Sequence, residues 1–481
     1  MILTLPLFSQ LILANHLVPA RDFEDSGILC YALLPTPETR ALIRFIIKDI
    51  RIHFMTCSAH EMEQLTRYWR AQLAPEMDDQ QAVELFKEDD LTDTDSDAPV
   101  IRTVNHLFER ALDLRASDIH FEPEASGLYV RCRVDGIMTT IKTLPLVHQP
   151  TITSRLKLMA KLDIGEKRLP QDGRIEHSIG DRILDLRVST LPGVHGESVV
   201  LRILDRDDIH VSLEHLGMPA KLLSTYQQLI TQANGMILVT GPTGSGKTTT
   251  LYASLEKINS RKQKIITIED PVEYQLDGVT QIQTNAKIGL SFSSGLRSIV
   301  RQDPDIIMIG EIRDSETAAI AIESALTGHL IFSTLHTNNA AGTIARLQDM
   351  GVEPYLLSSS LLAIQAQRLV RKICSHCRYE TTLTDIEAKL LDISQHDMPK
   401  VYHGRGCTHC GETGYQGRVG LYELLVITDA IRDLIGRGVD TNKIQQQAVL
   451  EGMQTLRLDA LEKLAQGITS PEEVVRVTTN K

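Results

Sequence analysis

Aromatic residues are scarce in this sequence, where they account for 4% of 481 positions and include a single Trp. Proteins that hold single-stranded nucleic acid commonly stack its bases on aromatic rings, so this scarcity disfavours such a platform. Basic residues are in the minority too: 50 Lys and Arg stand against 62 Asp and Glu, for a net charge of −12. DNA-coating proteins are more often basic in their binding domain, so we expect no nucleic-acid partner.

Long apolar runs are also missing. No stretch of 18 apolar residues occurs, so the sequence predicts no transmembrane segment of its own. The apolar residues 1–23 lack a basic segment and a convincing cleavage site, and we interpret them as part of a folded domain and not as a signal peptide. We expect a cytoplasmic protein that meets a membrane only through partners.

Internal repeats are absent, and the one compositionally biased segment is acidic. Residues 1–73 alternate short apolar runs with polar turns and predict a small N-terminal domain. Residues 74–99 follow with ten acidic residues and one Lys. Such a stretch repels itself and buries little, so we expect a flexible linker.

The remainder predicts an α/β protein. Residues 100–205 combine one helical pattern with several strand-like runs and predict a compact α/β domain. Over residues 206–370, short β-rich runs alternate with helical patterns, which is typical of a parallel sheet flanked by helices. The pattern of residues 416–481 is mostly helical.

A complete phosphate-loop motif lies between a buried-type strand and a helix. Gly241 to Thr248 fits G-x-x-x-x-G-K-[ST], whose glycines let backbone N–H groups point at phosphate oxygens. Lys247 is expected to reach the β- and γ-phosphates of ATP, and Thr248 to offer its hydroxyl to Mg²⁺. The residues predicted to bind nucleotide are Gly241, Pro242, Thr243, Gly244, Ser245, Gly246, Lys247, Thr248 and Thr249. A glycine-rich turn without a ligand, or a loop that binds nucleotide without hydrolysing it, are the alternatives.

Carboxylates follow two of the predicted strands. Glu311 comes after the apolar run "DIIMIG" and is our candidate for polarising the attacking water. Glu269, Asp270 and Glu273 follow "IITI", at the sheet edge where parallel sheets bind ligands. Two strands that both end in acids indicate a shared site for metal and water, although a single exposed acid would be unremarkable.

Two histidines flank a third strand-like run, "LIFSTL". Either His329 or His336 could contact the γ-phosphate or respond to its loss. The alternative is a structural histidine whose hydrogen bonds are satisfied within the fold.

Four of the seven cysteines form two close pairs. Cys374 with Cys377 and Cys407 with Cys410 give two C-x₂-C units, and four thiolates suit a structural Zn²⁺. We therefore predict a zinc-binding insertion over residues 371–415. Disulfides are the alternative, but they are rare in the cytosol.

In this order, the motifs resemble the secretion ATPases that power type II secretion and type IV pilus assembly. The resemblance runs from about residue 98 to the end, whereas the first hundred residues match loosely. The stretches that carry it, besides the four cysteines, are "ASDIHFEP", "RLPQDGRI", "RVSTLPGVHGESVVLRIL", "GPTGSGKTTTLY", "IEDPVEY", "LRSIVRQDPDIIMIGEIRDSETA", "TGHLIFSTLHTN" and "QRLVRKIC".

The resemblance implies a PAS-like domain at 100–205 followed by a RecA-like P-loop NTPase domain, with ATP between them. It implies a homohexamer on the cytoplasmic side of the bacterial inner membrane, docked on a membrane platform and a membrane-anchored protein that residues 1–73 would grip. Retraction motors of this family typically lack the four cysteines, which favours an assembly or secretion motor that drives pilin-like subunits into a fibre.

The resemblance also implies a set of phosphate-sensing arginines. By motif these are Arg187 and Arg202 in the first domain, Arg346 and Arg418 in the second, and as a further possible contact Arg174. Guanidinium groups stabilise the charge that develops on phosphoryl oxygens, although most arginines in any sequence are solvated surface charges. Glu311 matches the family's proposed catalytic glutamate.

Two functions of other classes stay open. A DNA-translocating RecA-like ring would use the same nucleotide chemistry, but the acidic composition and the few aromatics disfavour it. A nucleotide-gated scaffold without turnover is disfavoured because Lys247 and Glu311 are both present.

Overall fold

The computed structural model divides into two compact units, Met1–Pro99 and Val100–Lys481. The described residues are 17–19, 26–31, 51–56, 99–179, 182–204, 211–393, 398 and 400–478. In the first unit they form a sheet in which β2 (Ser26–Tyr31) pairs antiparallel with β1 (Leu17–Pro19) and parallel with β3 (Arg51–Thr56). The rest of the predicted partner-docking domain, and the acidic linker up to Pro99, lie outside the described residues.

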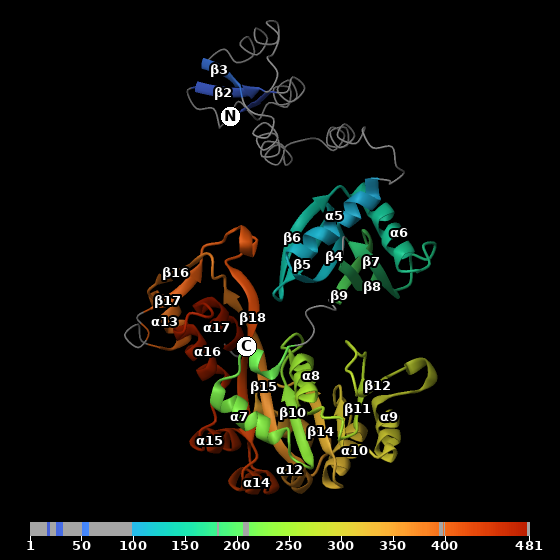
Figure 1. Ribbon diagram of the computed structural model, residues 1–481, viewed down its shortest axis with the longest axis vertical. Helices are drawn as coiled ribbons and strands as arrows, with labels where there is room; N and C mark the ends of the chain where they lie inside the picture. Colours follow the sequence, from blue (N-terminus) through green and yellow to red (C-terminus); the bar gives the residue numbers. More distant parts are fainter. Residues whose placement is uncertain are drawn as a thin grey trace. The chain divides into compact units, whose positions relative to one another are not determined.

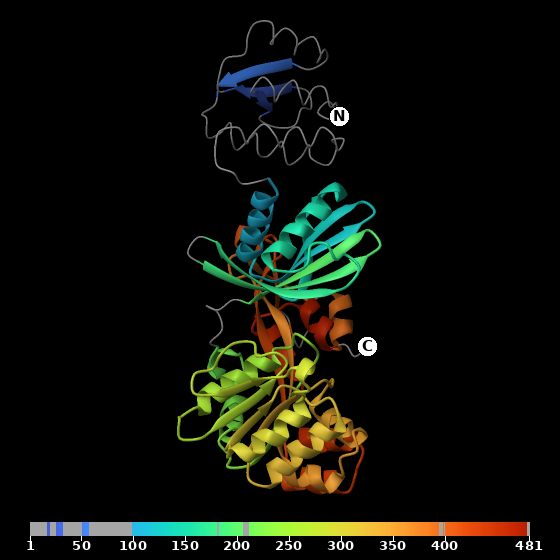
Figure 2. The same cartoon turned by 90° about the vertical axis from the view of Figure 1, so that its right-hand side faces the viewer.

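The second unit begins with an antiparallel sheet covered by two helices. The strand order is β6-β5-β4-β9-β8-β7, and α5 and α6 lie over the same face of the sheet (Figure 2). Apolar side chains at helical spacing on α5, among them Val104 and Phe108, pack with sheet residues into one core. The elements are α5 (Pro99–Asp113), β4 (Ala116–Glu124), β5 (Gly127–Val134), β6 (Ile137–Leu144), α6 (Gln149–Met159), β7 (Gln171–Ile179), β8 (Arg182–Gly193) and β9 (Gly196–Leu204). The predicted α/β domain is present; its assignment as PAS-like stays a prediction.

A seven-stranded sheet forms the centre of the half that follows the antiparallel sheet. Its order is β12-β11-β13-β14-β10-β15-β18, parallel throughout except for the antiparallel β15–β18 pair. The strands are β10 (Gly235–Thr240), β11 (Ile265–Glu269), β12 (Thr280–Gln283), β13 (Ile306–Ile309), β14 (Leu330–Leu335), β15 (Leu361–Ile373) and β18 (Tyr415–Val426). The sequence pattern predicted the parallel part. The expectation of a mostly helical segment from residue 416 overlooked β18, whose apolar run is of the buried-strand type.

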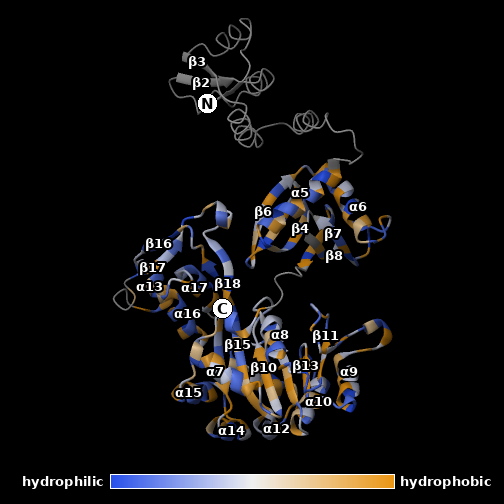
Figure 3. Cartoon of the chain, in the orientation of Figure 1, coloured by the Kyte–Doolittle hydropathy of each residue, from blue (hydrophilic) through white to orange (hydrophobic). Residues whose placement is uncertain are grey.

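Helices cover both faces of this sheet. Alternate residues of β10 face opposite cores: Met236 and Leu238 pack on one side, Ile237 and Val239 on the other. Because both faces are buried, the central strands, which are labelled in Figure 1, are rich in apolar residues, which Figure 3 colours orange. The helices are α7 (Ala220–Leu229), α8 (Lys247–Ile258), α9 (Phe292–Ile299), α10 (Ser315–Leu326), α11 (Ala340–Asp349), α12 (Pro354–Ser360), α14 (Asp429–Gly436) and α15 (Thr441–Leu450).

The four-cysteine segment is inserted between two paired strands of the main sheet. It leaves at the end of β15, forms a small antiparallel pair and one helix, and returns at β18. The C-terminal helices pack against it around a shared apolar cluster that includes Leu383, Val401 and Leu464. Its elements and these helices are β16 (Arg378–Thr381), α13 (Asp385–Leu391), β17 (Val401–Gly404), α16 (Leu456–Ala465) and α17 (Pro471–Thr478).

The helices of the described residues are all too short or too polar to cross a lipid bilayer.

Candidate active site

The phosphate loop joins the end of β10 to the start of α8. Gly241, Gly244 and Gly246 have φ angles of 153°, 75° and 86°, which side chains rarely tolerate. A Cβ at Gly241 would collide with the carbonyl oxygen of Gln367, and one at Gly246 would lie 2.7 Å from the Nε2 atom of the same residue. Glycine is therefore required at both positions, because β15 passes directly beneath the loop.

Gln367 of β15 ties this loop to the sheet. Its Nε2 donates to the carbonyl oxygen of Ser245 at 2.7 Å, and its Oε1 accepts from Thr250 Oγ1 at 2.8 Å. The Gln367 side chain is buried, so both hydrogen bonds are protected from water. The sequence analysis missed this residue. The one sequence signal for Gln367 was its place in the family stretch "QRLVRKIC". The phosphate-loop motif does not reveal which strand lies next to β10.

Lys247 folds back over the phosphate loop. Its Nζ donates to the carbonyl oxygens of Gly241 at 2.9 Å and Pro242 at 3.1 Å. Burial lowers the pKa of Lys247, the nearby carboxylate of Glu311 acts to raise it, and the nearby Arg368 lowers it further. A desolvated cation at this position favours a bound polyanion. Thr248 is exposed in the first turn of α8.

Arg368, the second site residue that the sequence analysis missed, adds positive charge beside Lys247. Its guanidinium donates to the carbonyl oxygens of Asn338 at 2.8 Å and Gln367 at 3.1 Å. Burial lowers its pKa, while Glu423 acts to raise it. The adjacency of β15 and β10 brings this cation to the loop.

Glu311 follows β13 and lies in the same electrostatic neighbourhood as Lys247. Its Oε1 accepts a hydrogen bond from Arg313 Nη2, and its Oε2 lies 3.5 Å from Nε2 of His336, which follows β14. Burial acts to raise the pKa of Glu311, but Arg313 and His336 outweigh burial and hold it below its ordinary value. The structure thus brings together three residues that the sequence placed at separate strand ends: Lys247, Glu311 and His336.

The carboxylates after β11 divide into different environments. Glu269 is buried and accepts hydrogen bonds from the Tyr252 hydroxyl, from Thr267 Oγ1 at 2.5 Å and from Gln281 Nε2 at 3.2 Å. Burial raises its pKa. Both oxygens accept hydrogen bonds, and the bond from Tyr252 ties β11 to α8; participation of Glu269 in a site for metal and water stays a prediction.

Asp270 and Glu273 are the accessible members of that group. Asp270 Oδ2 lies 3.9 Å from Nη1 of Arg313, which also binds Glu311. Glu273 Oε2 lies 3.5 Å from Nη1 of Arg187. Asp270 therefore belongs to the Glu311 cluster, whereas Glu273 faces the preceding domain.

The structure does not bring His329 to this edge of the sheet. Its backbone carbonyl accepts from Gly235 N at the start of β10, and its Nδ1 lies 2.9 Å from the carbonyl oxygen of Ser324. The loop follows the other end of β10, roughly 16 Å away at about 3.3 Å per residue. Within one chain the run "LIFSTL" separates His329 from His336, and contact of His329 with a γ-phosphate stays a prediction.

Arg187 is the predicted arginine that reaches across to the half that contains the phosphate loop. It donates to the carbonyl oxygen of Val272 at 3.0 Å, next to its ion pair with Glu273. The others have different neighbours within the chain. Arg202 pairs with Asp118 at 3.1 Å, Arg418 lies 3.5 Å from Asp135, Arg174 binds Asp185, and Arg346 is exposed on α11.

The four cysteines converge into one cluster. Their sulfur atoms all lie within 4.8 Å of one another, with separations of 3.9 Å for Cys374–Cys407, 3.9 Å for Cys377–Cys410 and 3.7 Å for Cys407–Cys410. Four sulfurs at about 2.3 Å from a tetrahedral Zn²⁺ would be about 3.8 Å apart. None of the four forms a disulfide.

Backbone N–H groups support negative charge on this cluster. The amides of Cys407 and Gly414 donate to Sγ of Cys410 at 3.2 and 3.3 Å. Burial acts to raise the pKa of Cys410, but these donors and the neighbouring thiols bring it to about 7, whereas burial raises the pKa values of Cys377 and Cys407. The residues present therefore fit a tetrahedral thiolate metal site, since the thiolate is the metal-binding form.

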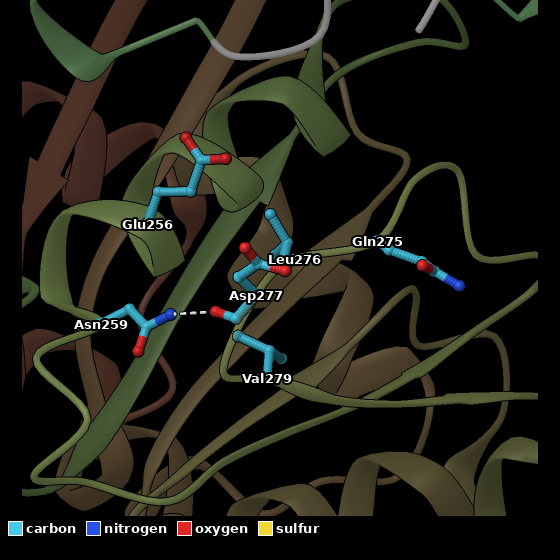
Figure 4. Close-up of a pocket in the computed structure, with 6 residues that line it drawn as sticks. All are labelled: Glu256, Asn259, Gln275, Leu276, Asp277 and Val279. Atoms are coloured by element: carbon cyan, nitrogen blue, oxygen red, sulfur yellow. Dashed lines mark hydrogen bonds between the residues drawn. The ribbon is translucent and has the colours of Figure 1, made fainter.

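A cavity of about 280 Å³ lies at the opposite end of α8 from the phosphate loop (Figure 4). One wall is closed by the hydrogen bond from Asn259 Nδ2 to the carbonyl oxygen of Asp277, at 2.6 Å. It contains none of the predicted site residues. Its lining is Glu256, Asn259, Gln275, Leu276, Asp277 and Val279.

Comparison with known proteins identifies the family. A family model described as Type II/IV secretion system protein matches residues 93–476. The chain is 50% identical over 397 residues to Type II secretion system protein E of Klebsiella pneumoniae, covering 82% of this chain and 79% of that protein. It is 45% identical over 461 residues to the protein of the same name from Pectobacterium carotovorum, covering 94% and 92%. The Type II secretion system ATPase E of Vibrio cholerae is 47% identical over 397 residues, covering 82% and 79%.

Two solved structures have folds similar to that of this chain. The pilus retraction motor PilT with bound ADP has a TM-score of 0.53 at 29% identity, covering 78% of this chain and 97% of that one. The Legionella pneumophila ATPase DotB, at 22% identity, shares the fold with a TM-score of 0.58, covering 80% and 98%. The chain belongs to the type II/IV secretion system protein family, and it is an ATPase.

Replacement of Gln367 by Leu tests how the loop is held. The change leaves the Ser245 carbonyl and the Thr250 hydroxyl buried without partners, at a cost of about 1–3 kcal/mol each. We expect ATP affinity, measured by fluorescence titration, to fall roughly tenfold because the loop loses its shape. Gln365→Leu is the comparison variant: Gln365 is equally buried, and its loss removes only a long hydrogen bond from its Nε2 to Oε1 of Gln367, at 3.4 Å, while the bonds from Gln367 to Ser245 and Thr250 stay in place. Equal affinities of the two variants would contradict the role of Gln367.

Proposed function

We propose that the chain is the ATPase subunit of a homohexameric motor that hydrolyses ATP at the cytoplasmic face of the bacterial inner membrane. The motor would drive pilin-like subunits into a fibre for type II protein secretion. The observation that carries this proposal is the convergence of Lys247, Glu311 and His336 at the carboxyl edge of a parallel sheet. Relatives named for type II secretion favour that system over type IV pilus assembly.

ATP binding rests on the phosphate loop. Backbone N–H groups of Gly241–Thr249 surround the phosphates, and the N-terminus of α8 adds a favourable dipole. Lys247 leaves the carbonyl oxygens of Gly241 and Pro242 and turns to the β- and γ-phosphates, and Thr248 offers the hydroxyl ligand for Mg²⁺. Bound Mg²⁺ would neutralise charge between the β- and γ-phosphates.

Hydrolysis requires a water activated opposite the leaving group. Glu311 accepts one proton from that water, while the water oxygen bonds to the γ-phosphorus and the bond from phosphorus to the bridging oxygen breaks. His336, 3.5 Å from the same carboxylate, is placed to sense the γ-phosphate. Asp270 supports this cluster through Arg313.

Arginines from the preceding domain couple hydrolysis to motion. Arg187 contacts the segment after β11. A movement of that segment on hydrolysis would therefore be transmitted to the domain of residues 100–204. Arg202, Arg346 and Arg418 would complete the charge around the phosphates of a neighbouring subunit after release from their present partners. This arrangement requires a ring in which the neighbouring subunit supplies the remaining arginines of each ATP site.

The four cysteines would hold a structural Zn²⁺. A closed set of four thiolates leaves no open position for catalysis, so the metal would stabilise the insertion and not act on ATP. The docking role of residues 1–73, toward a membrane-anchored partner and a membrane platform, rests on resemblance alone.

Two substitutions separate binding from turnover. Lys247→Ala is expected to abolish ATP binding or turnover. Glu311→Gln is expected to keep ATP affinity and to lower kcat by a factor of about 10²–10⁴, since the amide cannot take the proton. Phosphate release and nucleotide titration on the full chain measure both. Normal hydrolysis by Glu311→Gln would exclude Glu311 as the base.

Metal content tests the zinc proposal. Cys374→Ser removes one of four thiolates, so we expect bound zinc, measured by elemental analysis, to fall from one per chain toward zero. The insertion and α16 should then unfold at a lower temperature. Cys132→Ser is the control, because Cys132 is a buried free cysteine on β5, in the domain of residues 100–204. Full zinc in the Cys374 variant would refute the site.

The ring and its biological role have separate tests. With a non-hydrolysable ATP analogue, sedimentation should give six times the chain mass of 53.6 kDa. In the host bacterium, the Glu311→Gln allele should abolish release of secreted proteins. Intact secretion together with lost pili would instead place the motor in pilus assembly.

A further inference from the structure

The guanidinium of Arg313 lies between two carboxylates that come from different strands. Nη2 donates to Oε1 of Glu311, two residues earlier on the same loop. Nη1 lies 3.9 Å from Oδ2 of Asp270, which follows β11. β11 and β13 are neighbours in the sheet, so one side chain joins the tips of two adjacent strands.

The contact with Arg313 restricts the orientation of the Glu311 side chain. The Glu311 side chain is 18% exposed, against 60% for Arg313 and 46% for Asp270. With Oε1 bonded to Arg313 and Oε2 facing His336, the carboxylate has one favoured orientation. Without the guanidinium, a half-buried glutamate on a loop would be free to rotate and would be more easily protonated.

We propose that Arg313 is a positioning residue for ATP hydrolysis: it keeps Glu311 ionised and aimed, with Asp270 anchoring the other side of the guanidinium. This inference rests on the proposed role of Glu311 as the base. Arg313 acts through Glu311 and not on nucleotide, so it governs kcat and leaves ATP affinity unchanged.

The charged groups that face Glu311 determine in which direction its pKa moves when Arg313 is replaced. They are Arg313 on its own loop, His336 after β14 and Lys247 at the start of α8, with Asp270 behind Arg313. Arg313 lowers the pKa of Glu311. Its removal therefore raises that pKa, a smaller fraction of Glu311 is ionised in mild acid, and the acid limb of kcat moves to higher pH.

The test compares Arg313→Gln, which keeps hydrogen-bonding capacity without charge, with Arg313→Lys, which keeps the charge. We measure kcat on the full-length protein from about pH 3.5 to 9, so that the range includes the acid limb of a carboxylate with a lowered pKa, and ATP affinity with a fluorescent analogue. For Arg313→Gln we expect kcat to fall roughly tenfold through misalignment, the acid limb to move to higher pH, and affinity to stay within about twofold. Arg313→Lys should keep the wild-type limb, and Asp270→Asn should give a smaller loss of kcat.

Two further variants control the result. Arg437→Ala removes an exposed arginine that pairs with Asp433 on α14, and it should change neither kcat nor its pH profile. The whole comparison is repeated in a His336→Gln background, because the His336 imidazole lies 3.5 Å from the same carboxylate.

The outcomes separate this inference from the proposed function. Loss of turnover in Glu311→Gln, with an unmoved acid limb in Arg313→Gln, overturns the positioning role and leaves Glu311 as the base. A fall in ATP affinity that matches the fall in kcat/KM also overturns it, since Arg313 would then be a binding residue. Normal turnover in Glu311→Gln overturns both ideas together.

Discussion

Burial of the central sheet on both faces is the constraint on which the rest of the molecule depends. β10 and β13 are buried along their whole length because helices cover each side, and β13 is wholly apolar. The phosphate loop and Glu311 therefore follow the ends of these strands, where backbone N–H groups and charged side chains reach solvent. In parallel strands those ends coincide, which is why Lys247, Glu311 and His336 meet although they lie far apart in the chain.

The sequence predicted the parts of this site that depend on local spacing. The phosphate loop and Lys247 follow from the glycine pattern between a strand and a helix, and Glu311 follows from its place after an apolar run. The two cysteine pairs likewise imply convergence, because four such residues have few other uses in a reduced protein. In each case the information lies within a few neighbouring residues.

The features that could not be predicted depend on strand order and burial. Gln367 and Arg368 reach the nucleotide loop because β15 lies next to β10, which the order of elements along the chain does not reveal. Glu269 belongs to an acidic group by sequence, yet Tyr252, Thr267 and Gln281 enclose it. His329 and His336 flank the same strand, and only the direction of that strand places one beside the loop.

β15 has a further consequence, since it serves two sites at once. Gln367 on this strand holds the nucleotide loop, and the chain emerging from its end supplies Cys374 to the sulfur cluster. The strand is clamped along its length by β18, the segment that returns from that cluster. Because this one strand connects both sites, loss of a metal from the proposed four-cysteine site is expected to loosen the hold of Gln367 on the phosphate loop and so to lower ATP affinity.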